Sequence, residues 1–94
     1  MKIARVIWLE DIAEKIRRKH GVNQSEAVEV LKNQPLFRFV EKGYRRGENV
    51  YVALGQTNSR RYLAVFFVHK SGNQALIISA RDMTDSERRK YEER

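Results

Sequence analysis

The period of the apolar residues changes at Pro35, the only proline of the chain. Before it, apolar residues recur every three or four positions, as on one face of a helix. After it, they alternate in short segments separated by glycine, asparagine and serine, as in strands joined by tight turns. A chain of 94 residues has room for one domain. We therefore expect a single α+β domain over residues 1–94.

Two helices are predicted in the first third of the chain. The first covers residues 9–19, and Gly21 ends it after a basic last turn, which is a common helix stop. The second begins at Asn23, with Glu26 placed three positions later as in a capping box. It ends at residues 33–35, because the residue before a proline avoids the helical conformation.

The strands are predicted from β-branched and alternating segments. A short one precedes the helices, and the others follow Pro35, at residues 3–8, 36–40, 49–56, 62–69 and 74–80. Residues 41–48 contain two glycines and are interpreted as a loop. Short links favour antiparallel pairing, so a three- or four-stranded antiparallel sheet is expected. A capping box from Thr84 to Glu87 then opens a C-terminal helix that runs through Tyr91.

The charge of the chain indicates a polyanionic partner. Nineteen basic residues face twelve acidic ones, which gives a net charge of +7 and an isoelectric point near 10.1. Nucleic acid is the first candidate, an acidic protein the second and a membrane surface the weakest.

Several classes of protein are disfavoured by composition. Cysteine is absent, which excludes disulfides and thiolate chemistry and is consistent with a cytoplasmic location. No segment approaches the roughly 20 apolar residues of a membrane span, and the first residues do not form a signal peptide. The two histidines, His20 and His69, belong to no metal-binding motif. Neither a metal nor another cofactor is therefore predicted.

The C-terminal third resembles the signature of the BrnT toxin family. Residues 77–81 read Ile-Ile-Ser-Ala-Arg, and residues 84–92 place Thr84, Glu87, Arg88 and Tyr91 at the spacing that the family shows after that segment. Residues 19–22 (Lys-His-Gly-Val) and 53–57 (Ala-Leu-Gly-Gln-Thr) also resemble family segments, in the same order. Two positions differ, because Leu9 replaces a usual aspartate and Leu76 replaces a frequent arginine.

The resemblance implies a RelE-like fold and a ribonuclease that cleaves mRNA. It also implies a type II toxin–antitoxin system, in which a BrnA-like antitoxin with a DNA-binding domain neutralises the toxin and helps to repress the operon. Without a metal, such an enzyme can use the 2′-OH of RNA to attack the adjacent phosphate. The protein must then supply a base, an acid and cations that stabilise the charge of the transition state.

Five residues are candidates for catalysis: Arg81, Arg61, His20, Lys19 and Tyr91. Arg81 ends the last strand, where its guanidinium can bind phosphate in a bidentate manner. The alternative for Arg81 is a surface pair with Asp82 or Asp85, and Arg61 can equally be a solubilising charge at a hairpin tip.

The other candidates also have structural alternatives. Histidine is a residue type that can act as an acid or a base near neutral pH, but a histidine at a helix end, such as His20, is often structural. Lys19 beside it can bind phosphate. Tyr91 can stack on a base or donate a proton, or it can fill the interface between helix and sheet. Glu26 is interpreted as a cap rather than a base.

Three further arginines are predicted to bind RNA: Arg60, Arg88 and Arg89. Two other functions remain open at this point. One is a nucleic-acid-binding module without catalysis, although the acidic second helix is a poor reader of a DNA groove. The other is a BrnT-like protein that has lost catalysis, as Leu76 suggests, and only binds an antitoxin.

Overall fold

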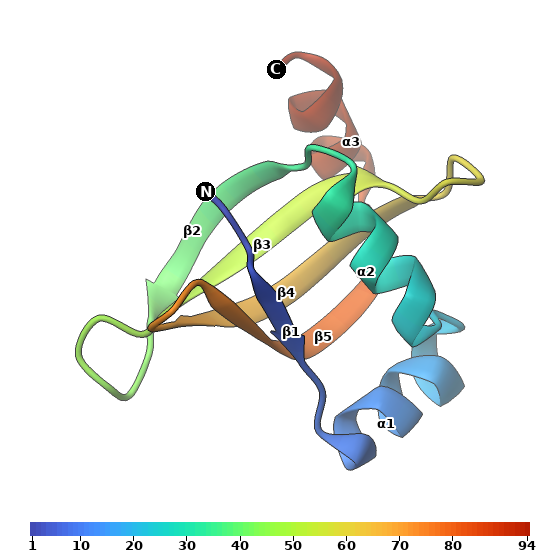
Figure 1. Ribbon diagram of the computed structural model, residues 1–94. Coiled ribbons are helices and arrows are strands. Elements are labelled where there is room, and N and C mark those ends of the chain that lie inside the picture. The colour runs from blue at the N-terminus through green and yellow to red at the C-terminus, as the bar shows by residue number, and fades with distance from the viewer.

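The computed structural model describes residues 1–94 and contains one mixed sheet and three helices. Along the chain the elements are β1 (Arg5–Ile7), α1 (Glu10–His20), α2 (Gln24–Lys32), β2 (Leu36–Lys42), β3 (Asn49–Gln56), β4 (Tyr62–Lys70), β5 (Gln74–Asp82) and α3 (Asp85–Glu92). The α+β class, the two N-terminal helices and the C-terminal helix are confirmed (Figure 1).

The sheet has five strands in the order β1-β5-β4-β3-β2, so the prediction of three or four antiparallel strands was wrong. β2 to β5 are antiparallel neighbours, as their short links predict, but β1 pairs with β5 in parallel. Arg5 lies opposite Gln74, and the amide of Ala4 donates to the carbonyl of Asn73. This pairing joins segments about 70 residues apart, which local pattern does not report.

The loop predicted at residues 41–48 is shorter than expected, because β2 continues to Lys42. The pairing of β2 with β3 shifts between Phe39 and Glu41, so Val40 is an extra residue in the strand. Such a bulge turns the side chains after it to the other face. Phe39 and Lys42 therefore share one face of the sheet, whereas Glu41 lies on the opposite one.

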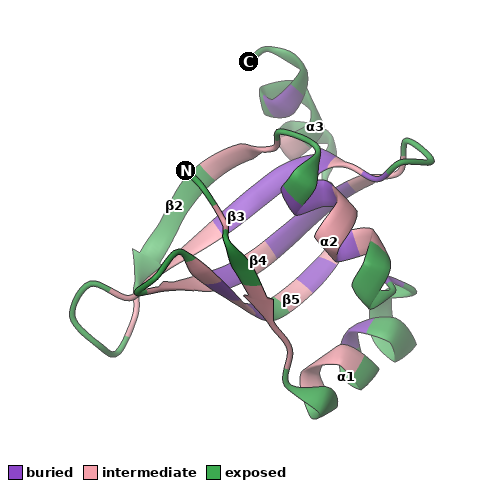
Figure 2. Ribbon diagram, in the orientation of Figure 1, coloured by how far each residue is buried: buried purple, intermediate pink, exposed green.

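The two faces of the sheet carry separate cores. The face that we call the α2 face is covered by α1, which packs on β5, and by α2, which packs on β3 and β4. Its core contains Ile16, Val30, Leu63 and Phe67, among others. Figure 2 shows the buried residues along the middle of β3, β4 and β5 and on the side of α2 that faces them.

The opposite side, which we call the α3 face, has a smaller core of Val52, Leu54, Ala64 and Tyr91. Tyr91 is 6% exposed and is the one buried residue of α3. The capping box that was predicted at Thr84 is present, because the Thr84 hydroxyl accepts from the Glu87 amide and the Glu87 carboxylate accepts from the Thr84 amide. None of the three helices has the length and apolar character needed to cross a membrane.

Candidate functional site

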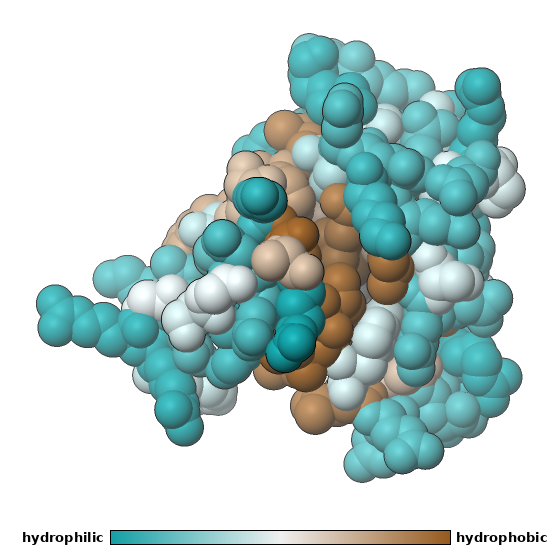
Figure 3. Space-filling view, viewed as in Figure 1, coloured by the Kyte–Doolittle hydropathy of each residue, from teal (hydrophilic) through white to brown (hydrophobic).

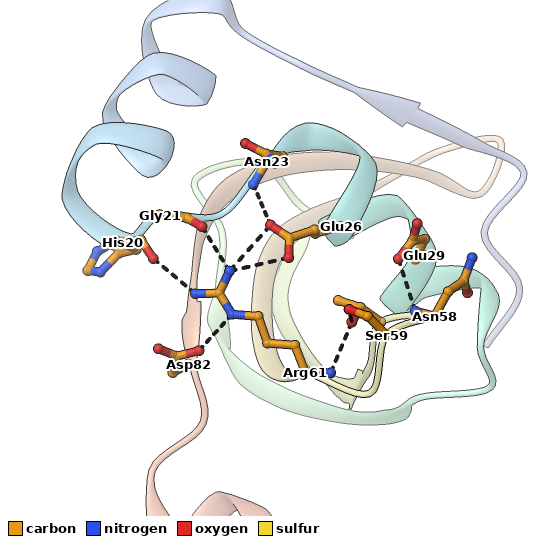
Figure 4. Close-up of polar contacts among 10 residues, drawn as sticks. His20, Gly21, Asn23, Glu26, Glu29, Asn58, Ser59, Arg61 and Asp82 are labelled. Atoms are coloured by element: carbon orange, nitrogen blue, oxygen red, sulfur yellow. Dashed lines mark hydrogen bonds and ion pairs between the residues drawn. The ribbon is translucent and has the colours of Figure 1, made fainter.

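Arg61 lies at the junction between α1 and α2. Its guanidinium donates to the carbonyl oxygen of Gly21 at 2.8 Å and to that of His20 at 3.2 Å, which are two groups left free at the end of α1. Gly21 holds the left-handed conformation of the helix end, with φ +62°. Figure 4 shows the guanidinium between these carbonyls and two carboxylates.

The two carboxylates belong to the start of α2 and the end of β5. Asp82 accepts from Arg61 Nε at 3.0 Å, and both oxygens of Glu26 lie 3.3 Å from Nη1. Glu26 also accepts from the Asn23 amide at 3.0 Å, as a cap does. Hydrogen bonds and charge from Asp82, then Glu26, raise the pKa of Arg61 above its ordinary value. Arg61 is thus a structural clamp with few donors left for a phosphate.

Neither Lys19 nor His20 takes part in this cluster with its side chain. Both residues are exposed at the end of α1, and Figure 4 shows the His20 ring pointing away from Arg61 while its carbonyl faces it. The interpretation of Arg61 as a solubilising charge at a hairpin tip was wrong, because its side chain is only 29% exposed and contacts three other segments.

Arg81 holds the start of α3 to the end of β5. Its Nη1 and Nη2 lie 2.8 and 3.0 Å from the two oxygens of Glu87, and Nη1 also donates to the Asp82 carbonyl. The guanidinium lies 5.1 Å from the centre of the Phe66 ring. The structural alternative for Arg81 was a pair with the side-chain carboxylate of Asp82 or Asp85. Arg81 pairs with neither of these carboxylates.

The Arg81–Glu87 pair is partly buried, with side chains 32% and 22% exposed. The hydrogen bonds and charge of Glu87 raise the pKa of Arg81. In turn, Arg81 and the Thr84 amide lower the pKa of Glu87, although burial opposes them. Glu87 is consequently a carboxylate at neutral pH, close to a guanidinium whose Nε makes no hydrogen bond within the chain.

Other cations lie on the α3 face and on α3 itself. Arg88 lies over the Tyr62 ring at 3.9 Å, and Arg89 is exposed on the same helix. Arg38 is exposed on β2 opposite Val52, which in turn lies opposite Phe66, so Arg38 and Phe66 share this face. The sequence analysis missed Arg38. Leu36 and Arg38 alternate with Phe37 and Phe39 in the sequence. This alternation predicts that Arg38 lies on the other face of the strand from the two phenylalanines.

The structure divides the predicted catalytic residues into two groups. Arg61, with Lys19 and His20 nearby, lies at the helix junction, whereas Arg81 and Tyr91 lie on the α3 face. Tyr91 is buried against the Tyr62 ring, and its hydroxyl donates to Gln56 at 3.4 Å. Tyr91 therefore fills the interface between helix and sheet, which was the structural alternative to a catalytic role. Arg60 is exposed in the turn between β3 and β4 with φ +72°, apart from the α3 arginines.

No group of three or more histidine, aspartate and glutamate side chains is arranged to hold a metal ion. The groups that are arranged for chemistry are therefore cations, one paired carboxylate and aromatic rings. Cations next to rings are a common surface for single-stranded nucleic acid, because phosphates bind the former and bases stack on the latter.

Replacement of Arg61 by methionine should destabilise the fold by about 2 kcal/mol, because two helix-end carbonyls lose a charged donor. Urea unfolding measures the change through the transition midpoint. Arg17→Met is the matched control, since the Arg17–Glu14 pair is exposed and lies within α1, where such pairs contribute a few tenths of a kcal/mol. Equal stability of the two variants would refute the clamp.

The Arg81–Glu87 pair should make stability depend on pH. Because the pKa of Glu87 is lower in the folded chain than its ordinary value of 4.5, its ionised form favours folding. That contribution is complete above about pH 4.5 and is lost as the pH falls through the folded-state pKa. Thermal unfolding of Glu87→Gln should therefore show a smaller loss of Tm between about pH 6 and pH 3 than the unchanged chain. An identical pH profile would contradict this account.

Comparison with known proteins places the chain in a family. The model of the family described as "Ribonuclease toxin, BrnT, of type II toxin-antitoxin system" matches residues 8–87. The crystal structure of the Brucella abortus ribonuclease toxin BrnT is similar in fold, with a TM-score of 0.60 and 19% identity over 86% of this chain and 97% of that one. No curated protein sequence matches. The family model covers most of the sequence, and the chain therefore belongs to the BrnT family of ribonuclease toxins of type II toxin–antitoxin systems.

Proposed function

We propose that this chain is the toxin of a type II toxin–antitoxin pair and cleaves mRNA without a metal ion, in the cytoplasm. The observation that carries the proposal is the Arg81–Glu87 pair, which lies beside Phe66 on a face that also carries Arg38 and Arg88. A BrnA-like antitoxin with a DNA-binding domain would neutralise the toxin. The RelE-like relationship implied by the sequence resemblance remains a prediction.

The pair suits cleavage by the neighbouring 2′-OH of RNA. A phosphate that binds the Arg81 guanidinium would compete with Glu87 for it and leave the carboxylate free to accept a proton. Glu87 would then take the proton of the 2′-OH as the 2′ oxygen bonds to phosphorus. The bond from phosphorus to the 5′ oxygen breaks, and that oxygen takes a proton from water. A 2′,3′-cyclic phosphate and a 5′-OH end are the products.

The arginines have separate tasks in this scheme. Arg81 stabilises the added negative charge on the phosphate oxygens as the new bond forms, which is where a fixed cation contributes most to rate. Arg38 and Arg88 hold the neighbouring phosphates, and Phe66 and Tyr62 offer rings to the bases. Arg89 and Arg60 add long-range attraction for RNA. Arg61 positions the helix junction that carries Lys19 and His20.

An inactive BrnT-like binding module is the second candidate, and one observation favours it. Leu76 lies opposite Val68 on the α3 face, in a row of apolar side chains, at the position where an arginine is frequent in the family. This copy thus has one cation fewer on the face where the proposed chemistry takes place. The cleavage experiment separates the two functions.

The decisive measurement is cleavage of a defined RNA by the purified protein in excess EDTA, with mass analysis of the new ends. We expect cyclic phosphate ends from the unchanged chain and a loss of about 100-fold or more in Arg81→Ala, since removal of one stabilising group has an effect of this size. Arg17→Ala, a change on the exposed face of α1, should cut normally.

Three results would decide against parts of the proposal. Cleavage that stops in EDTA refutes metal independence. Normal cleavage by Arg81→Ala refutes the placement of the site. Binding of RNA without cleavage, both by the isolated protein and in the presence of ribosomes, would support the inactive binding module.

Tyr91 gives a test of its structural role. Tyr91→Phe keeps the ring that packs on Tyr62 and removes only the hydroxyl, so we expect cleavage within about twofold of the unchanged chain. Tyr91→Ala removes the one buried residue of α3 and should reduce both stability and cleavage, because Glu87 and Arg88 lie on that helix. A strong loss in Tyr91→Phe alone would return Tyr91 to the list of catalytic residues.

A further inference from the structure

The α2 face is not fully covered by helices. α2 packs on β3 and β4, and the rings at the β2 edge remain partly open. Phe39 is 56% exposed and contacts the Tyr51 ring edge-on, with centroids 5.9 Å apart. Phe37 contacts the buried Phe67 in the same manner at 6.0 Å. Phe37, Phe39 and Tyr51 thus form an aromatic edge on the α2 face.

An apolar groove of about 400 Å³ opens on the same core, between the N-terminal segment and α2. Ile3, Val6, Trp8, Val28 and Leu31 line it. Figure 3 shows apolar atoms gathered in a hollow of this side of the molecule, bordered by hydrophilic side chains. Ile3, Val6, Trp8, Phe37 and Tyr51 all pack against the core of the α2 face. The groove and the aromatic edge are therefore two exposed parts of one core.

Cations outnumber carboxylates around this surface. Arg5 and Lys32 stand at the rim of the groove, and Lys42 lies on the α2 face beyond Phe39. None of the three makes an ion pair within the chain. Of the two carboxylates in the hairpin, Glu41 lies opposite Val50 on the α3 face, and Glu48 pairs with Lys70 at 3.0 Å. Glu29 lies next to Trp8 and Lys32, and it accepts from the Asn58 amide at 3.0 Å. The unpaired cations of this surface therefore outnumber its carboxylates and attract acidic groups.

β2 also forms an edge of the sheet. One side of its backbone has no strand partner, which is the usual place for an extended segment of another chain to add. An added strand would put alternate side chains over Phe39 and next to Lys42. A segment that alternates apolar and acidic residues fits both the edge and its charge.

We propose that the antitoxin anchors itself here, with an acidic and apolar extended segment that adds beside β2 and covers the aromatic edge and the groove. This inference rests on the proposed function, which supplies the antitoxin as partner. A protein fits better than RNA, because the groove is lined mainly by aliphatic side chains and the edge of β2 offers backbone groups to an added strand. The anchor lies on the opposite face from Arg81 and Arg38, so those two arginines lie outside the contact.

The test uses the antitoxin encoded beside this chain, purified from the co-expressed complex, and measures its Kd for variants of the toxin. Phe39→Ser and Lys42→Glu should each weaken binding by at least about tenfold, because one removes an apolar contact and the other reverses a charge. Arg38→Glu is the matched control, since it reverses a charge on β2 on the opposite face, and its affinity should stay within about twofold. Binding of the unchanged toxin should also weaken with added salt.

RNA cleavage by Phe39→Ser and Lys42→Glu should equal that of the unchanged toxin, which shows that both variants fold. An unchanged Kd in both variants overturns the proposal, as does a loss confined to Arg38→Glu or an antitoxin that does not bind the unchanged toxin. A loss of RNA binding with unchanged antitoxin affinity assigns the surface to nucleic acid instead. If the toxin cuts no RNA but the two variants keep the Tm of the unchanged toxin and still weaken the complex, the docking surface stands and the proposed catalysis fails.

Discussion

The five-stranded sheet has two apolar faces, and the three short helices that pack on it cannot cover both. Burial of apolar area is the main favourable term in folding, and the helices cover the middle of the sheet, over Phe67 and Leu63 on one face and over Leu54 on the other. The parts of the sheet that the helices do not cover remain exposed at the surface of the molecule. On the α3 face the open part is bordered by arginines and one paired carboxylate. On the α2 face it is bordered by unpaired cations around aromatic and aliphatic side chains.

The end of β5 connects the junction between α1 and α2 to the start of α3. Asp82 accepts from Arg61 through its side chain and from Arg81 through its carbonyl, so one residue joins the helix junction to the start of α3. Arg61 has most of its donors committed to helix ends and carboxylates, whereas Arg81 keeps Nε free and shares Glu87 with a helix cap. Arg61 and Arg81 were both candidates for catalysis from the sequence, but they differ in how many hydrogen-bond donors remain free. Arg61 is fixed by two carboxylates and two carbonyls, and Arg81 pairs with a single carboxylate.

Much of the fold could be predicted, because it depends on local signals. Gly21, the capping box at Thr84 and the change of period at Pro35 each act within a few residues of themselves. The parallel pairing of β1 with β5 could not be predicted in this way, since a strand of three residues carries little pattern and its partner is far away in sequence. The bulge at Val40 is similar, because only the register with β3 shows it. The same limit applies to the site. Glu26 was understood as a cap from its spacing, but its contact with Arg61 spans 35 positions.

The distribution of charge explains how one small domain can have two polyanionic partners. A net charge of +7 attracts RNA and acidic protein alike at long range, so charge alone does not separate them. The side chains that lie between the cations distinguish RNA from an acidic protein. Arginines next to aromatic rings favour phosphate and bases, because guanidinium groups bind phosphate in a bidentate manner and rings stack on bases. Unpaired cations around an apolar groove and an open strand edge favour a peptide, because a peptide brings both a backbone for the edge and apolar side chains for the groove. The bulge at Val40 divides the side chains of β2 between the two surfaces, since it places Arg38 and Glu41 on one face and Phe39 and Lys42 on the other.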